Sequence, residues 1–170
     1  MNDKKTSVRT LTMLALLVAM SIVFSRVLSI STGFVRFNLG SLPVLLAALL
    51  FGPGAGFAVG AVADIIGGVL AGYAINPLIT LGAGAIGLVA GYAWQKLPVN
   101  RTGLRLSISV LLGHFVGSMV INSLALRIFY GYAWSVLLAR IPNALVLSVV
   151  NTVLLRILLE NRSLMKLAKK

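Results

Sequence analysis

Residues 39–95 read LGSLPVLLAALLFGPGAGFAVGAVADIIGGVLAGYAINPLITLGAGAIGLVAGYAWQ, and this stretch decides the fold. Asp64 is its one charged residue. The stretch is too long for a single membrane helix, which needs roughly 20 apolar residues to cross a bilayer. A soluble domain would need a polar exterior around a core of this kind. The stretch therefore predicts an integral membrane protein.

Breakers rich in glycine, proline and aromatic residues divide the chain into six predicted membrane helices. They are FGPG at 51–54, GYAINP at 72–77, a polar patch at 31–38, a loop at 95–105 and an aromatic belt at 129–134. The predicted spans are about 8–30, 39–51, 54–70, 78–94, 106–128 and 135–159. We expect the short second span, which carries Pro43, to be tilted, kinked or partly buried in protein.

The distribution of positive charge supports six spans. The chain has 15 Lys and Arg against three acidic residues, a net charge of +12. The basic clusters are Lys4, Lys5 and Arg9; Lys96, Arg101 and Arg105; and Arg156, Arg162, Lys166, Lys169 and Lys170. With six spans all three clusters fall on one side, which the positive-inside rule makes the cytoplasm, whereas five spans would place one cluster outside. We therefore expect an all-α bundle of six transmembrane helices, one domain over residues 1–170, with both termini cytoplasmic.

A nucleic-acid interface is not favoured, because the cations sit at span ends and not on a basic face with interleaved aromatic residues. Catalysis is not predicted either. The chain lacks cysteine, a P-loop and a G-x-S-x-G motif, and His114 is its single histidine. We therefore expect no catalytic residue, no metal site and no cofactor.

Four arginines remain outside the cytoplasmic clusters: Arg26, Arg36, Arg127 and Arg140. The six-span topology places them in the outer half of the bilayer or just outside it. Such cations are costly in a membrane unless they reach lipid phosphates or face a cavity. We favour a cavity for the deeper Arg26 and Arg140, while both interpretations stay open for Arg36 and Arg127. A cavity with surplus positive charge would bind an anion, because arginine pairs bidentately with a carboxylate.

Three further residues near the predicted outer ends complete the candidate substrate-binding set: Tyr73, Asn76 and Trp134. The aromatic rings could stack on a planar ligand, although interfacial aromatic belts also form without one. Asp64 is the single acidic residue at membrane depth. It is either a buried counter-ion for an arginine, which we favour, or a group that couples a proton or sodium ion to transport.

Small residues line two faces of the predicted helices. Glycines at 52, 56, 60, 68 and 72, with Asp64 between them, recur every four residues, and Ala15 and Ala19 lie one turn apart in the first span. Small residues let membrane helices approach closely. Packing within the chain is the favoured interpretation of the glycines, and docking of another protein is the alternative.

Several segments together resemble the substrate-binding S components of energy-coupling-factor (ECF) vitamin transporters. They are ALLVA at 15–19, FSRVLSI at 24–30, VRFNLGSLPV at 35–44, LFGPGAG at 50–56 and VADIIG at 62–67. The resemblance covers nearly the whole chain and is closest to the branch with folate and pantothenate S components. Folate members carry an F-P-G-F-T-like stretch where this chain reads YAINPLITLG at 73–82. Folate, pantothenate and another anionic vitamin therefore stay open as ligands.

The resemblance implies a mechanism. An S component of a bacterial plasma membrane binds its vitamin from outside with high affinity. It then associates with a transmembrane coupling subunit and two ATPase subunits, and it topples in the bilayer to release the vitamin inside. Ala15 and Ala19 correspond to the family's contact face for the coupling subunit. The alternatives are a self-sufficient secondary transporter of a small organic anion and a purely structural membrane subunit.

Overall fold

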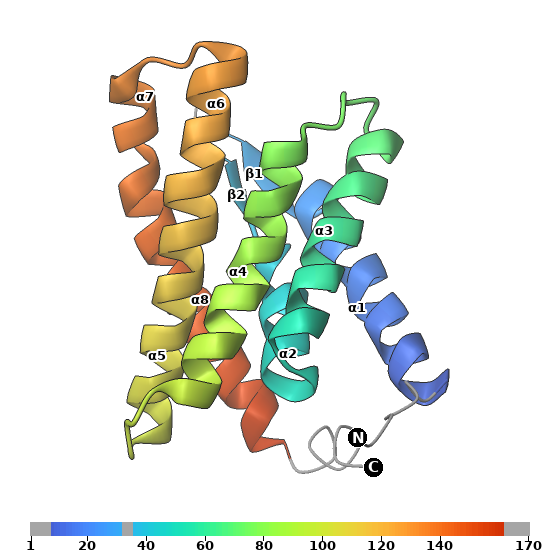
Figure 1. Ribbon diagram of the computed structural model, residues 1–170, viewed down its shortest axis with the longest axis vertical. Helices are drawn as coiled ribbons and strands as arrows, with labels where there is room; N and C mark the ends of the chain where they lie inside the picture. Colours follow the sequence, from blue (N-terminus) through green and yellow to red (C-terminus); the bar gives the residue numbers. More distant parts are fainter. Residues whose placement is uncertain (1–7, 32–35, 162–170) are drawn as a thin grey trace.

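The computed structural model describes residues 8–31 and 36–161 and shows a mostly helical bundle (Figure 1). Its helices, in chain order, are α1 (Val8–Arg26), α2 (Ser41–Phe51), α3 (Pro53–Leu70), α4 (Pro77–Lys96), α5 (Thr102–Gly113), the π-helix η1 (His114–Ile121), α6 (Asn122–Tyr130), α7 (Trp134–Leu138) and α8 (Arg140–Glu160). Many large apolar side chains point outward from these helices. That arrangement suits a bilayer, where the exterior of a protein is apolar.

A short antiparallel ribbon follows α1 and corrects the all-α prediction. The first span was expected to continue to Ile30, but α1 ends at Arg26 and the chain turns into a strand. β1 (Ser29–Ser31) pairs with β2 (Arg36–Asn38) in the register Ser29↔Asn38, Ile30↔Phe37 and Ser31↔Arg36. Both segments alternate polar and apolar residues, a period of two that fits a strand better than a helix.

The break between helices α2 and α3 depends on one glycine. Gly52 has φ +101°, a backbone conformation that residues with a side chain rarely adopt, and Pro53 then begins α3. α2 is short, and residues 42–45, 47 and 48 are buried. This burial agrees with the expectation that the second span is partly covered by protein.

Close approach of α3 and α4 forms the centre of the bundle. A Cβ atom at Gly60 would lie 2.4 Å from the carbonyl oxygen of Ala83, and one at Gly87 would lie 2.6 Å from the carbonyl oxygen of Gly56. These glycines therefore serve packing within the chain, which was the favoured interpretation of the small-residue face.

Asn76 caps α4, because its Oδ1 accepts hydrogen bonds from the backbone N–H groups of Leu78 and Ile79.

The fifth predicted span is a longer rod of three helical segments, α5, η1 and α6, that together run from Thr102 to Tyr130. Gly113 and Gly117 face the backbone of α4 in this rod. At its far end Gly131, with φ +66°, turns the chain into α7 and α8. The described apolar core gathers beside this rod around Leu45, Leu106, Val110 and Leu155.

The connections gather at two opposite ends of the bundle. Figure 1 shows the start of α1, the α4–α5 connection and the end of α8 at the lower end, and the α3–α4 and α6–α7 connections at the upper end. Five helical segments are long and apolar enough to cross a membrane: 8–26, 53–70, 77–96, 102–130 and 134–160. α2, with 11 residues, is shorter. The count of six spans and the side of the termini stay predictions.

Candidate functional site

Arg26 and Tyr73 meet at the upper end of the bundle, although they are distant in the sequence. The guanidinium carbon of Arg26 lies 5.3 Å from the centroid of the Tyr73 ring, a cation–π arrangement. Arg26 is half-buried, and its Nε atom is buried without a hydrogen-bond partner. An unpaired buried donor is unfavourable until an acceptor reaches it. This pair can therefore bind a ligand that brings an acceptor, above all a carboxylate.

A second cationic cluster lies at the α6–α7 turn. Arg127 Nη1 donates a hydrogen bond of 2.9 Å to the carbonyl oxygen of Tyr132, and its guanidinium carbon lies 5.6 Å from the centroid of the Trp134 ring. Arg127 and Trp134 are both exposed. Arg140 is half-buried and begins α8, after the short helix α7. The structure thus brings two of the predicted binding residues, Arg127 and Trp134, together at this turn.

Two other predicted binding residues are placed differently. The backbone of Arg36 pairs with Ser31 in the ribbon, but the side chain of Arg36 lies outside the part of the chain that the structure describes. Asn76 is buried, and its Oδ1 is occupied in capping α4. A ligand role for either residue stays a prediction.

Asp64 lies on α3 at the interface with α4. Its Oδ2 accepts a hydrogen bond of 2.7 Å from the Thr80 hydroxyl. No ion pair joins Asp64 to any arginine side chain within the described residues, where the one ion pair is Arg156–Glu160. The counter-ion role of Asp64 therefore stays a prediction.

The predicted docking residues lie on an open face of α1. Ala15 and Ala19 are both exposed, and Leu11, one turn before Ala15, is exposed beside them. Few residues of α1 are buried within the bundle. The face is therefore available to lipid or to a partner.

A polar cluster at the middle of the bundle was not predicted. Asn151 Nδ2 donates to Ser41 Oγ at 2.9 Å and lies 3.0 Å from His114 Nε2, which joins α2, η1 and α8. Asn151 is fully buried, and its Oδ1 has no partner. The signal in the sequence was an asparagine within an apolar span, but nothing in the sequence indicated its partners.

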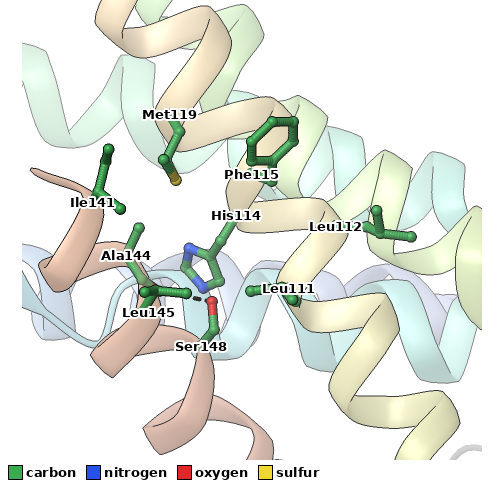
Figure 2. Close-up of a pocket in the computed structure, with 9 residues that line it drawn as sticks. All are labelled: Leu111, Leu112, His114, Phe115, Met119, Ile141, Ala144, Leu145 and Ser148. Atoms are coloured by element: carbon green, nitrogen blue, oxygen red, sulfur yellow. Dashed lines mark hydrogen bonds between the residues drawn. The ribbon is translucent and has the colours of Figure 1, made fainter. Parts of the chain in front are cut away.

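A cavity of about 310 Å³ lies beside this cluster, between the α5–η1 rod and α8 (Figure 2). Figure 2 shows His114 pointing from η1 toward α8, where Ser148 and Leu145 lie. The lining is apolar except for His114 and Ser148, and the Ser148 hydroxyl donates to the carbonyl oxygen of Ala144 within its own helix. The cavity therefore suits an apolar group, and none of the predicted binding residues lines it.

Comparison with known proteins gives consistent matches. Residues 5–164 match the family model described as ECF-type riboflavin transporter, S component. A relative named "Folate transporter FolT", from Clostridium novyi (strain NT), is 32% identical over 127 residues, which span 73% of this chain and 72% of the relative.

Two solved structures have the same fold. "Crystal structure of FolT bound with folic acid" superposes with a TM-score of 0.71 at 25% identity, over 86% of this chain and 90% of that one. "Structure and mechanism of the S component of a bacterial ECF transporter" gives a TM-score of 0.71 at 19% identity, over 90% of this chain and 94% of that one. At 19% identity the second match shows the fold alone.

Proposed function

The chain belongs to the family of ECF-type transporter S components, and we propose that it is the high-affinity binding subunit of an importer for an anionic B vitamin. The family consists of multi-pass membrane transporter subunits, not enzymes. Within it, the chain is a candidate for binding folate first and pantothenate second. The relative that carries the name folate transporter supports this order.

The positive charge at the upper end of the bundle is the main reason for proposing an anionic ligand. Arg26 is half-buried with an unpaired Nε, Arg127 lies beside the α6–α7 turn, and the half-buried Arg140 begins α8. Folate and pantothenate both have carboxylates, whereas riboflavin, named in the family model, has none. Tyr73 and Trp134 offer aromatic surfaces for a pterin ring. A ligand with a carboxylate and a planar ring therefore matches the available groups best.

The direction of transport follows from the proposed topology. Lys96, Arg101 and Arg156 lie at the lower end of the bundle, so the positive-inside rule places that end in the cytoplasm. The Arg26–Tyr73 pair then faces the outside of a bacterial plasma membrane. We propose that the exposed Ala15–Ala19 face docks a transmembrane coupling subunit, which in turn carries two ATPase subunits. Energy would come from those partners.

Binding by the purified protein tests the choice of ligand. The detergent-solubilised chain is titrated with folate, pantothenate and riboflavin, and any co-purified small molecule is identified by mass spectrometry. We expect folate to bind most tightly. Tight binding of riboflavin with no binding of either anion would overturn the proposal.

Uptake tests the transport mechanism. Cells that express the chain with a coupling subunit and two ATPases should accumulate labelled folate, and cells that express the chain alone should not. Accumulation by the chain alone, driven by an ion gradient and independent of ATP, would instead identify a secondary transporter.

A further inference from the structure

Gly67 of α3 lies directly against the guanidinium group of Arg26. A Cβ atom at Gly67 would be 3.3 Å from Arg26 Nε, 3.5 Å from Arg26 Nη2 and 3.7 Å from Ile22 Cγ1. The first of these distances is tighter than an ordinary van der Waals contact. A methyl group at position 67 would therefore displace the end of the arginine side chain by a few tenths of an ångström.

The same guanidinium group lies over the Tyr73 ring, whose centroid is 5.3 Å from the guanidinium carbon. Arg26 is thus a neighbour of both Gly67 of α3 and an aromatic ring. Its Nε, the atom nearest to position 67, is buried without a hydrogen-bond partner. A side chain at position 67 would therefore occupy space directly beside this guanidinium.

Two common reasons for a glycine do not apply at position 67. Its φ is not positive, because the described glycines with positive φ are Gly52, Gly72 and Gly131. It does not serve helix contact in the manner of Gly60, whose missing Cβ faces the backbone of α4. Alanine is otherwise preferred to glycine inside a helix. A methyl group at position 67 would meet the side chains of Arg26 and Ile22 on α1, and Arg26 is the nearer of the two.

We propose that Gly67 is a positioning residue that holds the Arg26 guanidinium in the orientation required by the carboxylate of the ligand. The inference rests on the proposed function, because it assumes that Arg26 binds that carboxylate. A bidentate pair of hydrogen bonds depends on the orientation of the planar guanidinium. Small displacements of a binding group can lower its contribution strongly.

The neighbouring Gly68 gives a matched control. It lies on the same helix and is also buried, but a Cβ atom there would meet nothing within 4 Å. Folate binding is measured for the parent, Gly67→Ala, Gly68→Ala, Arg26→Ala and the double variant Gly67→Ala/Arg26→Ala. Thermal unfolding is recorded for each protein. We expect Gly67→Ala to weaken binding about tenfold, by analogy with the loss that misplacement of a functional group causes, and Gly68→Ala to match the parent.

The double variant separates positioning from packing. If Gly67 acts through Arg26, Gly67→Ala adds no further loss once Arg26 is alanine. An equal loss in both backgrounds would show that the methyl group acts through helix packing, and it would overturn the proposal. Parent-like binding by Gly67→Ala beside weak binding by Arg26→Ala would also overturn it while leaving the proposed function intact. Parent-like binding by Arg26→Ala would show that Arg26 does not bind the carboxylate of the ligand, and it would overturn both this proposal and the ligand contact assigned to Arg26.

A folding defect in Gly67→Ala is also informative. If that variant does not fold, the double variant is examined for folding. Recovery on removal of the guanidinium would show that the methyl group conflicts with Arg26, as proposed. A persistent defect would assign Gly67 to packing alone.

Discussion

At the scale of the residue, the upper end of the bundle has aromatic rings where a soluble protein would place carboxylates. Arg26 lies over Tyr73 and Arg127 lies over Trp134, and neither forms an ion pair with an acidic side chain among the described residues. A cation–π contact attracts the guanidinium but does not neutralise its charge. The positive charge therefore remains available to an anionic ligand.

Arg26 gives the most direct test of this interpretation. Arg26→Ala should weaken folate binding by about 1.5–3 kcal/mol, the value of one hydrogen bond to a charged group. Arg26→Lys should restore part of the loss, because an ammonium group cannot reproduce the planar fork of arginine. The measurement is a ligand titration of folded protein in detergent. If Arg26→Ala binds as tightly as the parent, Arg26 is structural or faces lipid, and Arg140 becomes the next candidate.

The buried cluster of Asn151, His114 and Ser41 leads to a prediction about stability. Asn151→Ala should lower the free energy of unfolding by about 1–3 kcal/mol, because it leaves buried polar partners unpaired. Ser148→Ala is the matched control on the same helix, since that hydroxyl bonds to the carbonyl of its own preceding turn. Thermal unfolding in detergent compares the two variants. If Asn151→Ala is as stable as Ser148→Ala, the cluster makes no measurable contribution to the free energy of unfolding.

At the scale of the element, the sequence predicted the breaks between α2, α3 and α4, because glycine and proline act locally. It did not predict the β1–β2 ribbon, since segments of three residues carry too weak a pattern to separate from a polar loop. The π-helix η1 was also missed. It lies where Gly117 packs against the backbone of α4, a tertiary contact that no local sequence pattern shows.

The α3–α4 contact should be sensitive to a single methyl group. Gly60→Ala places a Cβ atom 2.4 Å from the carbonyl oxygen of Ala83, so the helices must move apart. We expect a loss of about 1–3 kcal/mol or more in the free energy of unfolding, as for other overpacked contacts. Gly54→Ala is the control, because a Cβ atom there meets nothing within 4 Å. A parent-like melting temperature for Gly60→Ala would contradict the close packing of these helices.

The exposed face of α1 should matter for transport and not for ligand binding. Ala15→Trp or Ala19→Trp should bind folate normally and abolish its uptake, because a bulky ring would keep a partner helix at a distance. Met20→Trp is the control, as it is exposed on the same helix but about 100° or more around its axis from the two alanines. Binding is measured on purified protein and uptake in cells with the coupling subunit and ATPases. Normal uptake by both alanine variants would exclude this face as the docking surface.

At the scale of the whole molecule, charge and hydropathy predicted a membrane bundle, and family-level sequence patterns predicted its class. The candidate site was predictable only in its charged and aromatic parts, because arginines in apolar surroundings stand out in a sequence. The cluster of Asn151 with His114 and Ser41 was not, since it joins three helices that are far apart in the chain. No local pattern encodes such a contact.

The topology proposed for the whole molecule can be tested with single cysteines, because the chain has none of its own. Ala74 and Ala133 lie exposed in the α3–α4 and α6–α7 connections, and Asn100 lies exposed in the α4–α5 connection. With six spans and a cytoplasmic lower end, a membrane-impermeant maleimide should label Ala74→Cys and Ala133→Cys on intact cells. It should label Asn100→Cys only after permeabilisation. The reverse pattern would show that the bundle has the opposite orientation in the membrane. The Arg26–Tyr73 pair would then face the cytoplasm, where it could not bind a ligand that arrives from outside. Labelling of Ala74→Cys and Ala133→Cys from opposite sides would instead show that the number of crossings between these two connections is odd, and the six-span count would be wrong.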